Sequence, residues 1–130
     1  MVKINGQEVE WKKFPDGWYL TDVQYHVLWK NEDTGAMFIL IKIPEGGVHE
    51  LVHKHTQSDQ MVFGLSGSMI RGGRLLTAGE GNYNFGYSPK GVYHGPPKES
   101  EITQELILLQ YYDGPPTRIN EGETVELTLE

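Results

Sequence analysis

The stretch GVHELVHKHTQSDQMVFGLSG, residues 47–67, decides the fold of this chain. His53 and His55 are two residues apart, so on an extended strand both imidazoles project from the same face. The polar residues 56–59 that follow are typical of a turn, and an apolar run begins directly after Gln60. Two histidines on one strand and a glutamine at the start of the next can therefore face a common point.

A second stretch, PKGVYH at residues 89–94, adds His94 directly after a Pro and Gly turn. The four neutral side chains His53, His55, Gln60 and His94 are candidate ligands for one metal ion. Imidazole binds zinc, iron, copper and nickel, and an amide oxygen is a harder ligand that also suits manganese or iron. The sequence therefore predicts a site for one divalent transition metal, with one or two positions open for water or substrate.

The spacing of these residues resembles that of the cupin superfamily. Its first motif reads Gly, five residues, His-x-His, three or four residues, Glu, six residues and Gly, and its second contains Pro-x-Gly followed two residues later by His. The matching positions are Gly47, His53, His55, Gln60 and Gly67 in motif 1 (residues 47–67), and Pro89, Gly91 and His94 in motif 2 (residues 83–98). The chain departs from the pattern at three positions: Gln60 replaces Glu, Tyr83 replaces Gly and Lys98 replaces Asn.

Composition favours the same fold class. The chain has 130 residues, 16 of them Gly and 7 Pro, and its short apolar runs are separated by turn signals without helical periodicity. This pattern predicts a single all-β domain over residues 1–130, a double-sheet jelly-roll barrel, which is also the fold (a double-stranded β-helix) that the cupin resemblance implies. The net charge of −7 argues against a nucleic-acid partner. The chain has no Cys and shows no membrane-spanning or signal segment, so we expect a cytoplasmic protein.

Several strands are expected from apolar runs. Residues 37–43 are almost continuously apolar, so both of their faces should be covered. Residues 83–87 alternate, which predicts a half-buried strand. The other expected strands are a hairpin of Val2–Ile4 and Val9–Trp11 around Asn5-Gly6, Tyr25–Lys30, Met61–Leu65 and Met69–Arg71 separated by Gly67, Ile102–Tyr112, and an edge or dimer strand at Thr124–Leu129.

The layout also resembles the small cupins that include acetylacetone and dihydroxyacetophenone dioxygenases. This resemblance implies an oxidoreductase in which His53, His55 and His94 hold non-haem Fe(II), with Gln60 as a further ligand, and in which oxygen cleaves a C–C bond of a small β-diketone or hydroxyaryl ketone. Zn(II), Mn(II) or Ni(II) are alternative ions. Small carbonyl or carboxylate compounds are the expected substrates, and a homodimer is the expected assembly.

Two alternatives remain open at this stage. Cupins that isomerise or open unsaturated sugar acids use a similar His-x-His, Gln and His set, with the metal as a Lewis acid; a redox-neutral isomerase, lyase or hydrolase therefore fits as well. Other cupins bind small ligands without catalysis. A neutral ligand set leaves the full charge on the ion, so it favours substrates that bring a negative charge.

Candidate catalytic residues must come from outside the ligand set. Gln110 and Tyr87 are predicted to line the pocket, with Gln110 and Leu108 on the same face of one strand. His49 is expected at the surface, with the cavity entrance as the alternative. Arg71 and Arg74 are expected at exposed turn positions, with neutralisation of an acidic substrate as the alternative for both. Metal affinity is expected to fall below about pH 6.5, where free imidazoles become protonated.

Overall fold

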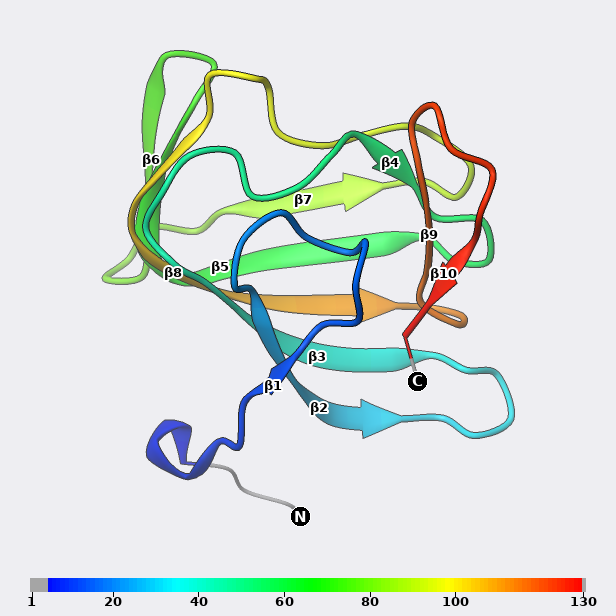
Figure 1. Cartoon of the computed structure of the whole chain (residues 1–130). Helices are drawn as coiled ribbons and strands as arrows, with labels where there is room; N and C mark the ends of the chain where they lie inside the picture. Colours follow the sequence, from blue (N-terminus) through cyan, green and yellow to red (C-terminus); the bar gives the residue numbers. More distant parts are fainter. Residues whose placement is uncertain (1–4, 130) are drawn as a thin grey trace.

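The computed structural model describes residues 5–129 and shows two antiparallel sheets (Figure 1). The larger sheet has the strand order β1-β2-β3-β8-β5-β6. Strand β7 pairs with the first residues of β5, Gln60 to Phe63, while β6 pairs with its last residues. Its strands are β1 (Lys12–Lys13), β2 (Gln24–Lys30), β3 (Met37–Ile43), β5 (Gln60–Arg71), β6 (Arg74–Ala78), β7 (Phe85–Ser88) and β8 (Glu101–Tyr112). The smaller sheet has the order β10-β9-β4, with β4 (His53–Lys54), β9 (Thr117–Asn120) and β10 (Leu127–Thr128). The all-β jelly-roll prediction is confirmed.

Strand β3 is the centre of the core. Met37, Ile39, Ile41 and Ile43 are buried and alternate with half-buried residues. The burial is therefore strongest on one face, whereas the sequence predicted full cover on both. The inner face packs on residues from the N-terminal loop, β2, β8 and the C-terminus, which include Trp18, Val23, Tyr25, Ile102, Leu106, Tyr112 and Leu129.

Strand register decides which residues of β8 and β5 face inward. Ile39 pairs with Gln110, and Ile41 pairs with Leu108. Directly opposite residues in an antiparallel pair share a face. The buried face of β3 therefore fixes Leu108 and Gln110 as inward, a choice between the two faces of this strand that the sequence left open. Gln60 pairs with Tyr112 and faces inward by the same rule.

Gly67 does not separate two strands, contrary to the prediction. It lies inside β5, where the pairing with β8 shifts register repeatedly between Gly64 and Met69. The φ of Gly67 is 96°, and a Cβ atom there would lie 2.1 Å from the carbonyl oxygen of Glu105. A β-bulge accommodates the glycine while pairing continues. The long strand therefore runs unbroken from the buried Gln60 to the exposed Arg71.

Other expectations need correction. Strand β7 begins at Phe85 and is exposed, with Tyr83 outside it at 96% exposure, so the predicted half-buried strand is wrong. In the N-terminal segment Gly6–Glu8 forms a 3-10 helix, η1, while the predicted partner Val2–Ile4 lies outside the described residues. Strand β9 was not predicted at all. Within residues 5–129, no helix is long and apolar enough to cross a membrane.

Candidate metal centre

The four predicted ligands meet between the two sheets. His53 belongs to β4 of the small sheet, His55 follows it directly, and Gln60 opens β5 of the large sheet. His94 lies on the loop before β8 and forms an isolated bridge with His53, with N···O distances of 2.8 and 2.7 Å. One ring nitrogen from each of the three histidines lies within 4.8 Å of the others. The structure therefore brings the three predicted histidines together.

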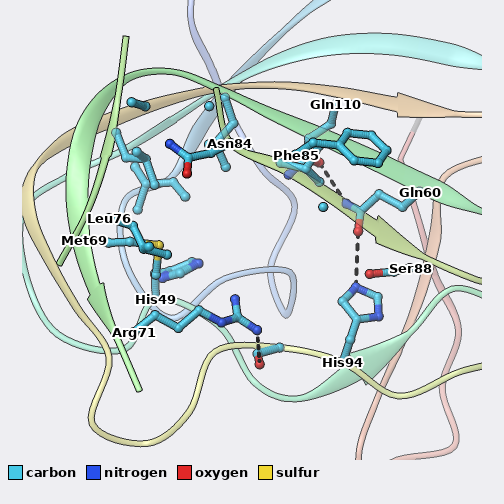
Figure 2. Close-up of a pocket in the computed structure, with 18 of the residues that line it drawn as sticks. His49, Gln60, Met69, Arg71, Leu76, Asn84, Phe85, Ser88, His94 and Gln110 are labelled. Atoms are coloured by element: carbon cyan, nitrogen blue, oxygen red, sulfur yellow. Dashed lines mark hydrogen bonds between the residues drawn. The ribbon is translucent and has the colours of Figure 1, made fainter. Parts of the chain in front are cut away.

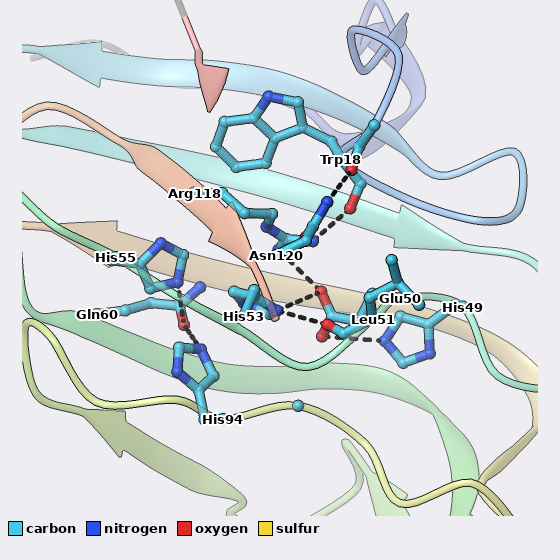
Figure 3. Close-up of polar contacts among 12 residues, drawn as sticks. Trp18, His49, Glu50, Leu51, His53, His55, Gln60, His94, Arg118 and Asn120 are labelled. Atoms are coloured by element: carbon cyan, nitrogen blue, oxygen red, sulfur yellow. Dashed lines mark hydrogen bonds and ion pairs between the residues drawn. The ribbon is translucent and has the colours of Figure 1, made fainter. Parts of the chain in front are cut away.

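Backbone carbonyls set the tautomer of each histidine. The Nδ1 atom of His53 lies 2.8 Å from the Leu51 oxygen (Figure 3). The Nδ1 atom of His55 lies 2.5 Å from the Thr117 oxygen. A carbonyl oxygen only accepts, so each Nδ1 carries the proton and each Nε2 keeps a lone pair. This is the arrangement in which metal-binding histidines are usually held.

His94 follows the same rule more loosely. Its Nδ1 atom donates to the Val92 oxygen at 3.2 Å. His94 is half-buried, whereas His53 and His55 are almost completely buried. The Nε2 atom of His53 is buried without a hydrogen-bond partner. A buried polar atom without a hydrogen-bond partner is energetically costly, so the free lone pair of His53 Nε2 indicates a position where another atom binds.

Gln60 presents its oxygen to the histidines. Its Nε2 atom donates to Gln110 Oε1 at 3.1 Å and to Tyr112 Oη at 2.9 Å, and Tyr112 donates in turn to Gln110 Oε1 at 2.9 Å. The amide is thereby fixed with Oε1 lying 3.2 Å from Nε2 of both His55 and His94. Because those Nε2 atoms and Oε1 all carry lone pairs, none of them can donate to another.

This convergence of acceptor atoms fits a cation. Four lone pairs, from three imidazoles and one amide, point at each other without a proton to share. Nitrogen ligands lie about 2.0–2.1 Å from a zinc-like ion, so two of them can be at most about 4.2 Å apart, and the histidine nitrogens, within 4.8 Å of one another, lie close to that limit. The three histidines could therefore hold a metal ion, and the oxygen of Gln60 lies beside two of them.

The pKa values keep the ligands neutral. Burial lowers the pKa of His53 to about 3, and the positive charge of Arg118 adds to the shift. Burial likewise lowers the pKa of His55 to about 4, against the opposing bond to Thr117. The pKa of His94 is also lowered, mainly by burial. Neutral imidazoles bind metal, so the fall in affinity predicted below about pH 6.5 moves to more acid solution.

A buried ion pair supports the histidine strand. Arg118 Nη2 lies 2.8 Å from Glu50 Oε2, and that oxygen lies 3.9 Å from His53 Nδ1 (Figure 3). Arg118 also donates to the Trp18 carbonyl oxygen, and its guanidinium carbon lies 4.9 Å from the centre of the Trp18 ring. Burial alone raises the pKa of Glu50, but Arg118 and a bond from His49 hold it well below its usual value. Glu50 is therefore ionised, and through Arg118 it connects the strand that carries His53 to the N-terminal loop at Trp18.

Comparison with solved structures identifies the fold. An acetylacetone dioxygenase from Acinetobacter johnsonii matches with a TM-score of 0.69 at 20% sequence identity, over 99% of this chain and 83% of that chain. An RmlC-like cupin protein from Ralstonia eutropha matches with a TM-score of 0.69 at 17% identity, over 98% of this chain and 78% of that chain. The chain has a cupin fold.

The cupin fold is shared by proteins of different kinds. A structure of Rhodobacter sphaeroides SigE with the anti-sigma ChrR matches at a TM-score of 0.58 and 17% identity, over 84% of this chain and 52% of that chain. No protein-family model matches the sequence, and no curated protein matches it. Similarity at this level shows the fold, so the function has to be argued from the site itself.

The histidine site opens into a cavity of about 510 Å³, comparable to pockets that bind small molecules (Figure 2). Gln60 and His94 line this cavity, so a metal ion held by these residues would be reached from it. Gln110 lines the cavity as well, as predicted, and its Oε1 atom accepts hydrogen bonds from Gln60 and Tyr112. Much of the remaining wall is apolar and comprises Ile43, Val62, Met69, Leu76, Ala78, Phe85, Leu106 and Leu108.

Two other candidates lie differently from what was expected. His49 is buried, at 6% exposure, and lines the cavity with its Nε2 atom 3.5 Å from Glu50 Oε1, so its predicted surface position is wrong. Tyr87 borders the cavity, but it pairs with the outward-facing Met61, and its hydroxyl donates to Asp59 Oδ2 at 3.1 Å. This bond raises the pKa of Tyr87. A catalytic role for Tyr87 stays a prediction that these contacts do not favour.

Sequence reasoning missed Glu50 and Arg118. Arg118 is a buried arginine in the short run Thr117–Asn120, which shows no apolar alternation. Neither the strand β9 nor the ion pair of Arg118 with Glu50 was therefore expected. Their only signal was the position of Glu50 three residues before His53, which places an acid close to the ligand strand without naming its partner.

Proposed function

We propose that this cupin is a metal-dependent enzyme that acts on a small carbonyl compound, and that its reaction is Fe(II)-dependent oxidative cleavage of a C–C bond in a β-diketone or hydroxyaryl ketone. The observation that carries the proposal is the convergence of four neutral acceptor atoms at the wall of a largely apolar cavity. The fold likeness to an acetylacetone dioxygenase adds support by analogy.

The bound metal would supply Lewis acidity and, as Fe(II), the redox chemistry with oxygen. His53, His55, His94 and Gln60 would hold it as neutral ligands, which would leave the ion its full charge and favour a substrate that brings a negative charge, such as an enolate. Their hydrogen bonds to backbone and side-chain groups hold the four donor atoms in place before any ligand arrives.

Gln110 and the apolar walls act on the substrate. The Oε1 atom of Gln110 accepts from Gln60 and Tyr112, which leaves its amide N–H groups to donate to a substrate oxygen in the cavity. An amide does not titrate, so Gln110 positions and polarises the substrate without moving a proton. Val62, Leu106 and Leu108 pack against the carbon skeleton and exclude water.

The apolar walls also favour a ketone over a sugar acid, because every hydroxyl of a sugar needs a polar partner when it is buried. One observation also supports the alternative of a redox-neutral isomerase, lyase or hydrolase, because a neutral ligand set suits Lewis-acid chemistry equally well. A non-catalytic binding protein would use the same cavity without turnover.

Oxygen uptake separates these functions. Protein reconstituted with Fe(II) under argon is mixed with acetylacetone or a hydroxyaryl ketone in an oxygen electrode, and we expect one oxygen molecule consumed per substrate cleaved. The His55→Ala variant and the Zn(II)-loaded protein are the controls and should consume none. Turnover of unsaturated sugar acids without oxygen would overturn the oxygenase in favour of the redox-neutral enzyme, and bound metal without any turnover would favour a binding protein.

A further inference from the structure

Arg71 lies at the end of β5 opposite to Gln60, on the rim of the cavity. Met69 and Arg71 are two residues apart on this strand and both line the cavity, so the arginine side chain lies on its inner side (Figure 2). Among residues 5–129, Arg71 is the one lysine or arginine that lines this cavity. The long strand thus carries a metal ligand at its buried end and a cation at its open end.

The guanidinium of Arg71 reaches toward the metal ligands. Its Nη2 atom donates to the carbonyl oxygen of Gly95 at 3.2 Å, and Gly95 directly follows the ligand His94. Within residues 5–129 its other N–H groups have no hydrogen-bond partner and no carboxylate forms an ion pair with it. The chain has 18 acidic and 11 basic residues, so a shortage of carboxylates does not explain this.

Arg71 places a positive charge on the cavity wall of an acidic protein. Among residues 5–129, Glu50 is the one carboxylate that lines the cavity, and it forms an ion pair with Arg118 at 2.8 Å. The candidate metal ligands are neutral, so a bound divalent ion keeps its full charge beside Arg71.

We infer that Arg71 is an anion-binding subsite, and that the substrate is a carbonyl compound bearing a carboxylate. The carbonyl oxygens face the metal ligands, and the carboxylate pairs with the free N–H groups of Arg71. A planar guanidinium matches a carboxylate through two parallel hydrogen bonds. This inference rests on the proposed function, because it assigns the substrate class of the same cavity.

The test compares two ligands that differ only in charge. Acetopyruvate has the β-dicarbonyl unit of acetylacetone with a carboxylate attached, and its methyl ester has nearly the same size without the charge. Binding to the Zn(II)-loaded protein is measured by calorimetry, without any need for oxygen chemistry. We expect acetopyruvate to bind about tenfold or more tightly than the ester, since a charge-assisted pair is lost in the ester. Arg71→Gln should remove this difference.

Arg74 provides the matched control. It lies directly across the hairpin from Arg71, is exposed and does not line the cavity. Arg74→Gln should keep the preference for acetopyruvate, and circular dichroism and zinc content should be unchanged in both variants. The inference is overturned if Arg71→Gln keeps the preference, or if Arg74→Gln loses it equally.

The same samples separate this inference from the proposed function. If the acid and the ester bind equally while the Fe(II)-loaded protein still consumes oxygen with acetylacetone, the anion subsite is wrong and the oxygenase stands. If neither ligand binds the Zn(II)-loaded protein, the assignment of this cavity as a substrate site fails, and the anion subsite fails with it.

Discussion

The two ends of β5 differ in how their polar groups are satisfied. At one end Gln60 is 5% exposed, and its amide is held by Gln110 and Tyr112 with its oxygen toward two histidines. At the other end Arg71 is exposed, with a single bond to the Gly95 carbonyl. The buried end is organised before anything binds, whereas the exposed end keeps donors available for a ligand.

This difference teaches where each kind of specificity resides. A metal ion requires fixed donors at short distances, and the buried end meets that need with backbone-anchored histidines. A substrate must enter and leave, and an exposed cation at the rim attracts it at little cost in stability. Changes at the buried end should therefore be severe, and changes at the exposed end should affect binding alone.

The largest effect is expected for His53→Ala, which should abolish stoichiometric metal binding. It removes a buried imidazole whose Nε2 atom has no other partner. Metal content of protein purified without chelators is measured by elemental analysis. His26→Ala is the matched control, because His26 lies on β2, its Nδ1 atom bonds to the Glu10 carbonyl oxygen, and it is not part of the three-histidine group. Equal metal content in both variants would contradict the ligand assignment.

The ion pair behind the site should dominate stability. Arg118→Met leaves the Glu50 carboxylate buried without its partner at 2.8 Å, which should cost about 3–5 kcal/mol in the free energy of unfolding. Urea denaturation of the metal-free protein measures this. Lys13→Met, which removes an exposed pair with Asp22, is the control and should change stability by less than about 1 kcal/mol. Similar losses in the two variants would show that burial of the pair is not decisive.

Acidification should weaken the metal-free fold before it weakens metal binding. The folded pKa values of His53 and His55 are lowered, so the unfolded chain takes up more protons below about pH 6.5. Stability is therefore present above that pH and is lost as the pH falls. The loss should be roughly 2 kcal/mol per buried histidine between about pH 7 and about pH 5. Urea titrations across this range measure it, with a flat profile as the contradicting result.

Exchange of Gln60 for glutamate should sharpen the role of the buried amide. Gln60→Glu adds a negative charge to the donor set and should tighten metal binding about tenfold, measured by competition with a chelator. It also replaces an N–H donor that now faces Gln110 and Tyr112, so the metal-free variant should lose about 1–3 kcal/mol of stability. Gln60→Ala should weaken metal binding, which distinguishes loss of a ligand from gain of a charge.

The smallest effect is expected at the exposed end. Arg71→Gln should change the free energy of unfolding by less than about 0.5 kcal/mol, because surface substitutions away from buried networks rarely do more. Urea denaturation checks this beside the ligand-binding assay. A loss as large as that of Arg118→Met would mean that Arg71 supports the fold, and the contrast between the two ends of β5 would disappear.

Much of the fold could be predicted because its signals are local. The apolar run Met37–Ile43 gave β3 with its correct bounds, and His-x-His spacing placed two imidazoles on one face. The parity of β8 could not be decided from apolar residues on both faces, and only pairing with β3 fixed Gln110 as inward. Register is a property of two strands together, so one strand alone does not reveal it.

The ion pair of Glu50 and Arg118 could not be predicted either, because it also depends on residues far apart in the sequence. Glu50 and Arg118 are separated by 68 residues, and each is a polar residue that sequence patterns assign to the surface. His49 was misplaced in the same way, since its burial depends on Glu50 and on the ring of Tyr19. Buried charges are predictable only when the partner is known, because burial without the partner is unfavourable.

The most direct test of the metal site is the tautomeric state of its histidines, observed by long-range ¹H–¹⁵N correlation NMR of the metal-free protein before and after addition of Zn(II). The account predicts the Nδ1–H form for His53, His55 and His94, with all three Nε2 resonances shifting when one equivalent of zinc binds. Protons found on the Nε2 atoms, or Nε2 resonances that stay in place with zinc present, would contradict it.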